Sequence, residues 1–290
     1  MPVVRDLIKG IVAVVLAFLF VEPSAGAAVL RGKVVDCDNG EPLPYATIKV
    51  RNRYGGAIAD TAGVFELYGR FQAGDTVVVS YVGYKAADVI AGSLAADSAC
   101  AAIRLEPLVM PLPEMSVRPK KQKRKRAGKK YATGMFSCCF NGKTQGEAMG
   151  YEFHSKEGCS MWLDRVGLYV KNEPVVADSI KFRVNIYDMS KVHTDPTTDF
   201  VNVLKTPIVF DYKKKDIQNG VYQYVLPELI RLPEHAMVEI EFLEDVGDRV
   251  LLYKCNMMGK NSWSRSGDEF WWCKNPAAGP FFIECLEIRR

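Results

Sequence analysis

The chain has 290 residues, of which 48% are hydrophobic and 25% are charged, which excludes a disordered protein and allows sizeable cores. Its length predicts about two domains. The formal net charge of +4 is small and comes from one basic segment, so the rest of the mature chain is mildly acidic.

The first 27 residues have the order of a secretory signal peptide. Arg5 and Lys9 precede an apolar run over 11–21, and small residues follow, ending in Ala-Gly-Ala at 25–27. The alternative is a membrane anchor, but the run is shorter than the roughly 20 residues that a spanning helix needs. We therefore expect an exported protein of the periplasm, the outer membrane or the cell surface.

Residues 28–107 predict a β-sandwich. Short β-rich runs such as "VLRGKVVD" and "YATIKVRN" are separated by turn signals, of which Asn39-Gly40 is one. Ala46, Ile48 and Val50 alternate with polar residues, which is the period of a half-buried antiparallel strand. About seven short strands without any helical period are typical of a sandwich.

The motifs of this region, "GKVVDCDNGEPLPYATIKV", "AIADTAGVFELYG" and "GDTVVVSYVGYK", resemble the carboxypeptidase-regulatory-like module. The resemblance covers Ala28 to about Pro107 and departs from the family at Ala57, where a Thr is usual. It implies a seven-stranded, transthyretin-like β-sandwich that is common in exported proteins of Bacteroidetes. It also implies packing roles for Tyr81 and Tyr84.

All eight cysteines lie in the part expected to be exported, where an oxidising environment permits disulfides. No pair has the C-x-x-C spacing of zinc knuckles and redox motifs. The sequence allows a disulfide between Cys37 and Cys100, and it leaves free buried thiols open as the alternative.

Residues 108–130 predict a linker. Prolines at 107, 111 and 113 disfavour a helix or a central strand, and "RPKKQKRKRAGKK" then contributes only basic charge. Such a segment is extended and self-repelling, and it is either a solvated linker or a contact with an anionic surface such as lipid head groups. The residues that would make the anionic contact are Lys120, Lys121, Lys123, Arg124, Lys125 and Arg126.

Residues 131–290 also predict strands, because apolar residues alternate with polar ones over 166–170, 180–187 and 238–242. Their order resembles the second domain that follows this module in some bacteroidete proteins of unassigned function. That resemblance implies a jelly-roll-like antiparallel sandwich. The predicted fold class is therefore all-β, with a transthyretin-like sandwich followed by a jelly-roll-like sandwich.

Catalytic signatures are weak in this sequence. His154 and Glu157 have the H-x-x-E spacing of zinc carboxypeptidase ligands, but only His193 and His235 remain as a third ligand. The strand-rich second half does not fit the large α/β catalytic domain of those enzymes. No G-x-S-x-G elbow and no phosphate-binding glycine loop occurs. We expect no catalytic residue, no metal and no cofactor.

Several carboxylates could meet in space as the acid and base of a glycoside hydrolase. The simpler interpretation is that they are solvated, since alternation puts Glu239 and Glu241 on the wet face of a strand. The other candidates are Asp164, Asp188, Glu244 and Asp245.

Aromatic residues gather near the end of the chain in "NSWSRSGDEFWWCKNP". Exposed tryptophans beside polar groups suit stacking against sugar rings. The alternative is packing, in which one of two adjacent tryptophans enters the core and the other covers its rim. The candidate binding residues are Trp263, Arg265, Asp268, Trp271 and Trp272.

The sequence thus favours an exported, non-catalytic two-domain β protein that binds a cell-envelope component, a glycan or a protein partner. A carbohydrate-binding accessory protein that uses the segment from Trp263 to Trp272 is the second interpretation, and a hydrolase is the third. Export argues against a nucleic acid as the partner.

Overall fold

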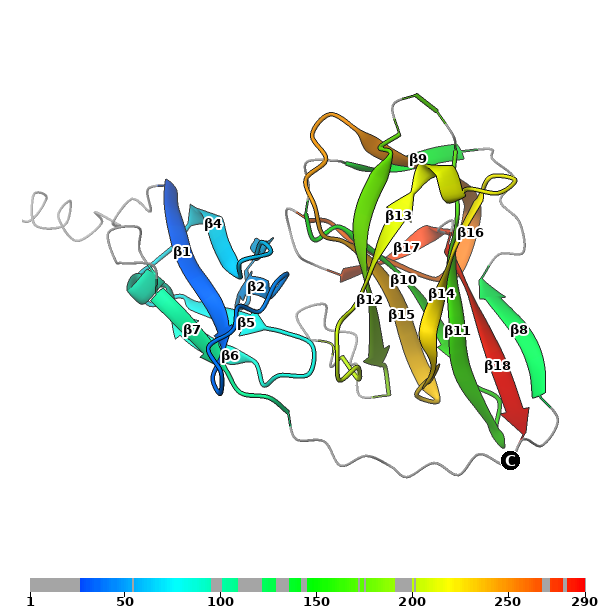
Figure 1. Ribbon diagram of the computed structural model, residues 1–290, viewed down its shortest axis with the longest axis horizontal. Coiled ribbons are helices and arrows are strands. Elements are labelled where there is room, and N and C mark those ends of the chain that lie inside the picture. The colour runs from blue at the N-terminus through cyan, green and yellow to red at the C-terminus, as the bar shows by residue number, and fades with distance from the viewer. Residues whose placement is uncertain are drawn as a thin grey trace, which may run out of the picture.

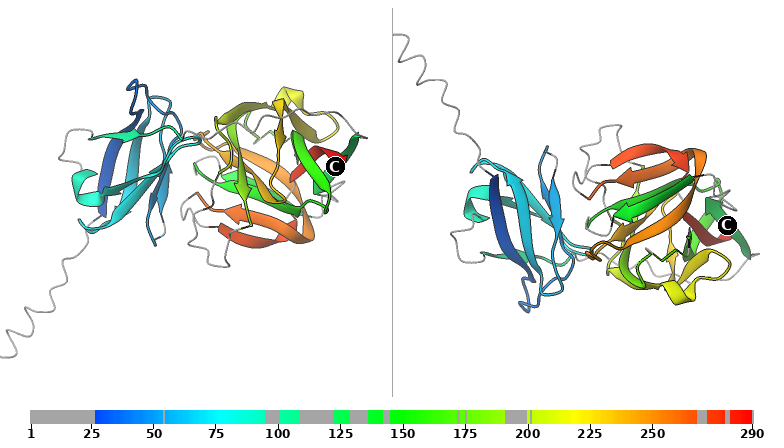
Figure 2. Two further views of the ribbon diagram at one scale, coloured as in Figure 1. Left: turned by 90° about the horizontal axis from the view of Figure 1, so that it is seen from below. Right: turned by 90° about the horizontal axis from the view of Figure 1, so that it is seen from above.

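The computed structural model describes residues 27–53, 55–94, 101–108, 122–128, 136–141, 145–171, 173–174, 176–190, 200, 202–267, 272–278 and 281–289. Two lobes are joined by a narrower waist (Figure 1), which is clearest from below and above (Figure 2). The described residues form strands and two short 3-10 helices, η1 (Ala91–Leu94) and η2 (Lys214–Asp216). The all-β fold class predicted from the sequence is confirmed.

No helix in these ranges is long and apolar enough to span a membrane. The predicted signal peptide lies, up to residue 26, outside the described residues, so it stays a prediction.

The first domain is a sandwich of two sheets. Its strands are β1 (Ala27–Asp36), β2 (Thr47–Val50), β3 (Gly56–Ile58), β4 (Val64–Arg70), β5 (Thr76–Ser80), β6 (Ala87–Ile90) and β7 (Ala101–Leu105). One sheet has the order β4-β1-β7 and the other β3-β2-β5-β6. The seven strands expected from the sequence are confirmed, with one departure from antiparallel pairing, because β1 and β7 run parallel.

The stretch "DNGEPLPYATIKV" builds a turn and then part of the core. Gly40 has a φ of 72°, a left-handed conformation that glycine adopts without strain, and the Glu41 amide donates to Asn39 Oδ1 at 2.8 Å. Ala46, Ile48 and Val50 are no more than 2% exposed. The predicted alternation is therefore confirmed, and this stretch is part of the framework of the domain.

The second domain contains two larger sheets. Its strands are β8 (Gln122–Gly128), β9 (Phe136–Asn141), β10 (Ala148–His154), β11 (Cys159–Tyr169), β12 (Ser179–Asp188), β13 (Ile208–Lys213), β14 (Val221–Arg231), β15 (His235–Phe242), β16 (Val250–Arg265), β17 (Trp272–Ala278) and β18 (Phe281–Arg289). One sheet has the order β13-β12-β15-β10-β16-β17, with β9 paired to the start of β16, and the other has the order β14-β11-β18-β8. The jelly-roll assignment stays a prediction.

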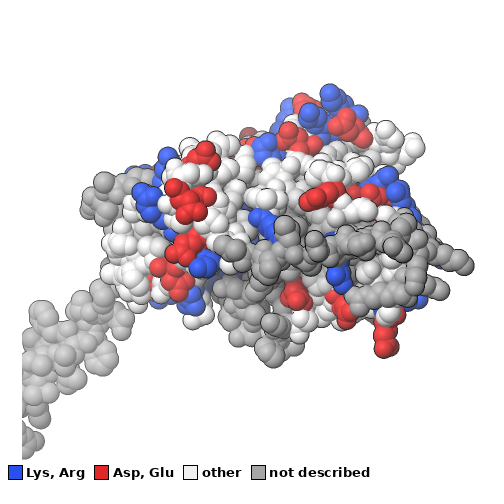
Figure 3. Space-filling view, turned by 60° about the horizontal axis from the view of Figure 1, so that its bottom comes forward, with Lys and Arg blue, Asp and Glu red and all other residues white. Residues whose placement is uncertain are grey.

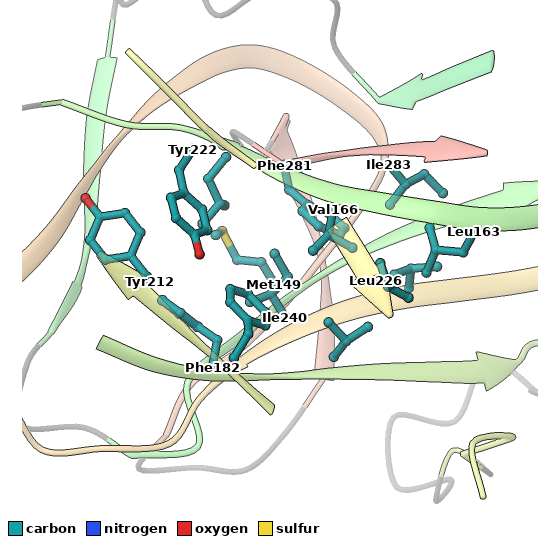
Figure 4. Close-up of a cluster of buried hydrophobic side chains, with 14 of the residues drawn as sticks. Met149, Leu163, Val166, Phe182, Tyr212, Tyr222, Leu226, Ile240, Phe281 and Ile283 are labelled. Carbon is teal, nitrogen blue, oxygen red and sulfur yellow. The ribbon is translucent and has the colours of Figure 1, made fainter. Parts of the chain in front are cut away.

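The apolar faces of these two sheets meet in one core (Figure 4). Phe182 on β12 and Ile240 on β15 are fully buried and belong to the same cluster as Val166 on β11 and Ile283 on β18. Successive residues of a strand point to opposite faces. The residues next to Phe182 and Ile240 therefore lie on the outer face of the large sheet.

The basic segment is not a free linker over its whole length. Residues 122–128 form β8, which pairs antiparallel with β18 and closes one edge of the second sheet (Figure 1). Lys125 pairs with Glu287, and Arg126 lies 2.5 Å from Glu284 Oε1 and 4.2 Å from the centre of the Phe282 ring. The prediction of a linker up to residue 130 is wrong for β8, because acidic partners distant in the sequence neutralise its charges.

The two domains dock through the loop that follows β5. Val82, in this loop, is 6% exposed and packs in the core cluster of the second domain. Its neighbour Gly83 has a φ of 82°, and a Cβ added there would overlap the carbonyl oxygen of Lys205. Glycine at position 83 is therefore needed both for the backbone conformation and for the close approach of the second domain.

Replacing this glycine should weaken the docking. We expect Gly83→Ala to lower the free energy of unfolding by about 2–4 kcal/mol, since alanine adds left-handed strain and a clash with a backbone atom. Denaturant unfolding would measure the loss, and small-angle scattering would show a larger radius of gyration. Gly74→Ala is the control, because its added Cβ meets nothing within 4 Å. Equal stability and equal size for both variants would contradict the docking role.

Candidate binding site between the domains

The outer face of the large sheet carries a buried row of charged and polar side chains. Arg183 and Asn185 lie on β12, directly opposite Glu241 and Glu239 on β15. These four side chains are no more than 3% exposed. The expectation that Glu239 and Glu241 lie on a wet face is therefore wrong, because the outer face of this sheet is covered.

Arg183 joins the two domains. Its guanidinium lies 2.6 Å from Glu241 Oε2, donates from Nη1 to the carbonyl oxygen of Tyr45 at 2.6 Å, and donates from Nη2 to Thr47 Oγ1 at 2.9 Å. Tyr45 and Thr47 belong to the first domain. Tyr45 has a φ of 62°, and its ring packs with Leu243 of the second domain. One cation thus satisfies an acid of its own sheet and two oxygen acceptors of the neighbouring domain.

A second arginine completes the row from the far side of β10. Arg265, on β16, donates to Glu241 Oε1 at 2.6 Å and to the Gly146 carbonyl at 3.0 Å. The strand between them carries small residues on this face, Ala148 and Gly150, and a Cβ on Gly150 would lie 2.6 Å from Met237 Sδ. Because β10 leaves this gap, the Arg265 side chain can cross it and reach β15.

The two glutamates have different electrostatic environments. Burial raises the pKa of Glu241, but Arg183, Arg265 and the hydrogen bonds from Arg183 and Asn185 hold it below its ordinary value. Burial raises the pKa of Glu239 to about 7, although Arg265 acts against this shift. Neither oxygen of Glu239 accepts a hydrogen bond of normal geometry from a described residue; Arg265, whose Nη2 is 3.5 Å from Oε1, and the Tyr187 hydroxyl are neighbours that act to lower its pKa. A buried carboxyl with so few partners is typical of functional sites.

A cavity of about 400 Å³ opens beside this row. Its first-domain wall includes Lys49, Tyr81, Tyr84 and Lys85, and its second-domain wall includes Arg183, Asn185, Tyr187, Phe200, Asn202, Glu241 and Arg265. Cavities between domains that combine aromatic rings with a few fixed polar groups are typical ligand sites. The packing role expected for Tyr81 and Tyr84 is only part of their contribution, since both rings also line this cavity.

The predicted tryptophan site is described only in part. Trp263 is half-buried, donates to Glu152 Oε2 at 2.8 Å, and meets the edge of Phe200 with ring centres 5.8 Å apart. Arg265 lies in the buried row described above. Asp268 and Trp271 lie outside the described residues, as does the side chain of Trp272. Of the predicted residues, Trp263 and Arg265 therefore lie on the covered outer face of the large sheet.

The remaining predicted residues fall on the first domain and on the basic segment. Cys37 is a free thiol whose Sγ donates to Asp38 Oδ1 at 3.1 Å, and Cys100 lies outside the described residues. Lys120 and Lys121 also lie outside them, whereas Lys123 is exposed on β8. Arg124 lies 3.1 Å from Asp164. Basic and acidic side chains lie near one another on the described part of the face in Figure 3.

A three-residue group that the sequence does not reveal lies further along the same outer face. Glu152 and His154 are on β10, and His235 on β15 lies directly opposite His154. His235 Nε2 is 2.7 Å from Glu152 Oε1. Although burial acts to raise the pKa of Glu152, hydrogen bonds from Trp263 and His235 hold it below its usual value. Glu157, the H-x-x-E partner considered for His154, is not part of this group.

Removing the central arginine should be costly. Arg183→Met leaves Glu241 with one cation and removes both contacts to the first domain, so we expect a loss of about 3–5 kcal/mol in the free energy of unfolding. Lys181→Met on the same strand is the matched control, because its ion pair with Asp211 is partly exposed and should contribute at most about 1 kcal/mol. Denaturant unfolding of both variants measures the difference. Similar small losses would show that the buried pair does not hold the domains together.

The stability should also depend on the ionisation of Glu239. Its folded-state pKa is raised, so its favourable contribution is full below its unfolded value of 4.5 and is lost as the pH rises through about 7. Compared with Glu239→Gln, the native chain should therefore lose on the order of 1–3 kcal/mol of stability between about pH 5 and pH 8.

Denaturant unfolding midpoints measured across this pH range would test how the stability depends on the ionisation of Glu239. The contribution of Glu241 has the opposite sign, because its pKa is lowered, and is lost only below 4.5. Glu234→Gln, at an exposed position just before β15, serves as the control and should keep the native slope. If the stability of the native chain and that of Glu239→Gln change equally with pH, the raised pKa of Glu239 is contradicted.

Comparison with known proteins supports the resemblance of the first domain. Residues 30–97 match the family model of the CarboxypepD_reg-like domain. No curated protein matches the chain. Among solved structures, a chain of the structure of infectious bursal disease virus Gx strain aligns with 90% of this chain and 78% of its own length, at 12% identity and a TM-score of 0.25, which is too low to indicate a shared fold. Residues 30–97 thus match a β-sandwich module without a catalytic role.

Proposed function

We propose that this protein is an exported, non-catalytic binding protein of the cell envelope, and that the cavity between its domains receives the ligand. The observation that carries the proposal is a cavity with walls from both domains, held in place by the buried Arg183 contacts. The ligand would be a cell-envelope component or a segment of a protein partner.

Two features of the sequence support export to the cell envelope. The first 27 residues have the charge, apolar core and small residues of a secretory signal. Residues 30–97 match the CarboxypepD_reg-like domain, and the resemblance to this module implies one that is common in exported proteins. The matched module has no catalytic role, which favours binding over turnover.

A glycan is the second candidate ligand. Four aromatic residues line the cavity beside hydrogen-bonding groups, namely Tyr81, Tyr84, Tyr187 and Phe200. Sugars present both an apolar face and hydroxyls, so this combination suits them. If the ligand is a glycan, its sugar rings would stack on the aromatic residues of the cavity wall.

The location can be tested by fractionation. The full chain expressed in its host should appear in the periplasmic or outer-membrane fraction at a size shortened by about 27 residues, as expected for a cleaved signal peptide. A chain lacking residues 1–27 is the control and should stay in the cytoplasm. Cytoplasmic recovery of the full chain would contradict export.

Binding at the cavity can be tested by titration with soluble envelope fragments. Muropeptides, lipopolysaccharide core oligosaccharide and neutral oligosaccharides are suitable probes for isothermal titration calorimetry. Tyr81→Ala should weaken binding of the active probe by on the order of tenfold, since it removes one aromatic contact. Tyr68→Ala is the control, because Tyr68 is 67% exposed and lies outside the cavity lining. Equal affinities for the two variants would place binding elsewhere.

A further inference from the structure

The outer face of the large sheet offers a second, separate site. Along β10, Ala148, Gly150, Glu152 and His154 lie on this face, and the side chains of the last two meet His235 of β15. The imidazoles of His154 and His235 lie nearly parallel, with ring centres 3.9 Å apart and an angle of 22° between the planes. Two neighbouring strands thus place two nitrogen ligands and one carboxylate side by side.

We propose that Glu152, His154 and His235 bind a divalent transition metal, for which zinc fits best. One ligand atom from each of the three residues lies within 4.8 Å of the others. Zinc binds imidazole nitrogens and carboxylate oxygens at about 2.0–2.2 Å, so tetrahedral ligands lie roughly 3.4 Å from one another. To bind one ion the two imidazole planes must turn out of their stacked arrangement, because a metal lies in the plane of each ring that binds it, and the ligand atoms must move to this spacing.

The carboxylate of Glu152 is already oriented by neighbouring donors. Its Oε2 accepts a hydrogen bond from Trp263 Nε1 at 2.8 Å and lies 3.6 Å from Lys274 Nζ. Its Oε1 faces His235 at 2.7 Å. Partners of this kind fix the orientation of metal ligands and contribute to metal affinity. The arrangement leaves Oε1 as the ligand atom, with Trp263 as a positioning residue.

The two histidines of the group are accessible from solvent. His154 is exposed, and it lines a shallow hollow of about 540 Å³ together with Ser155, Asp188, Ser190 and His235. Three protein ligands complete only part of a tetrahedral sphere, so water or an external ligand would take the fourth position. The metal site is distinct from the H-x-x-E arrangement, since it takes its acid from two residues before His154 and its second histidine from another strand.

Calorimetric titration of zinc chloride into the full chain, freed of metal by a chelator and dialysed, tests the proposal. We expect one zinc per chain. His154→Ala should weaken binding at least about 100-fold because it removes one of three ligands, and Trp263→Phe should weaken it by about 10–100-fold through the orientation of Glu152. Glu157→Gln is the control and should bind as the native chain does.

Two further measurements make the result decisive. The unfolding midpoint without metal should be nearly unchanged in His154→Ala, because this side chain is exposed, so a loss of binding there is not a loss of folding. Cobalt in place of zinc should give no thiolate-to-metal charge-transfer band, which separates this site from binding by cysteines. Stoichiometric zinc binding that survives in His154→Ala, or no binding by the native chain, would overturn the proposal and leave the group as a hydrogen-bonded His–Glu pair.

Discussion

The buried contact between Arg183 and Glu241 is the interaction on which the arrangement of the two domains depends. An arginine without water around it needs an acid and further acceptors, because the desolvation of its charge is otherwise uncompensated. Here the acid comes from the neighbouring strand, and the further acceptors come from Tyr45 and Thr47 of the first domain. The charge pair therefore gives the outer face of the large sheet a specific partner.

This contact explains why the part of the large sheet around Arg183 and Glu241 is buried on both sides. The inner face holds the apolar core, and the outer face holds a polar layer beneath the first domain, with Arg265 and Glu239 completing it. Buried polar networks favour one arrangement because their donors and acceptors are satisfied in few geometries. The cavity between the domains is the space that remains beside this network, and its shape follows from the fixed docking of the loop around Gly83.

Much of the fold could be predicted from the sequence because strands leave a local signal. The alternation around Ile48 and around Phe182 predicts both the strands and the residues of the core. The same alternation assigned Glu239 and Glu241 to solvent, since a pattern with a period of two distinguishes the faces of a strand but not what covers them. The three-residue group was missed for a related reason: Glu152 and His235 are 83 positions apart, and only the pairing of β10 with β15 brings them together.

The basic segment illustrates how an edge strand can depend on a distant part of the chain. β8 covers the hydrogen-bonding edge of β18, and its Lys125 and Arg126 neutralise Glu287 and Glu284. A fragment that began at residue 131 would leave this edge bare, and bare edges pair with strands of other molecules. The second domain is therefore best defined as beginning at residue 122, where β8 starts.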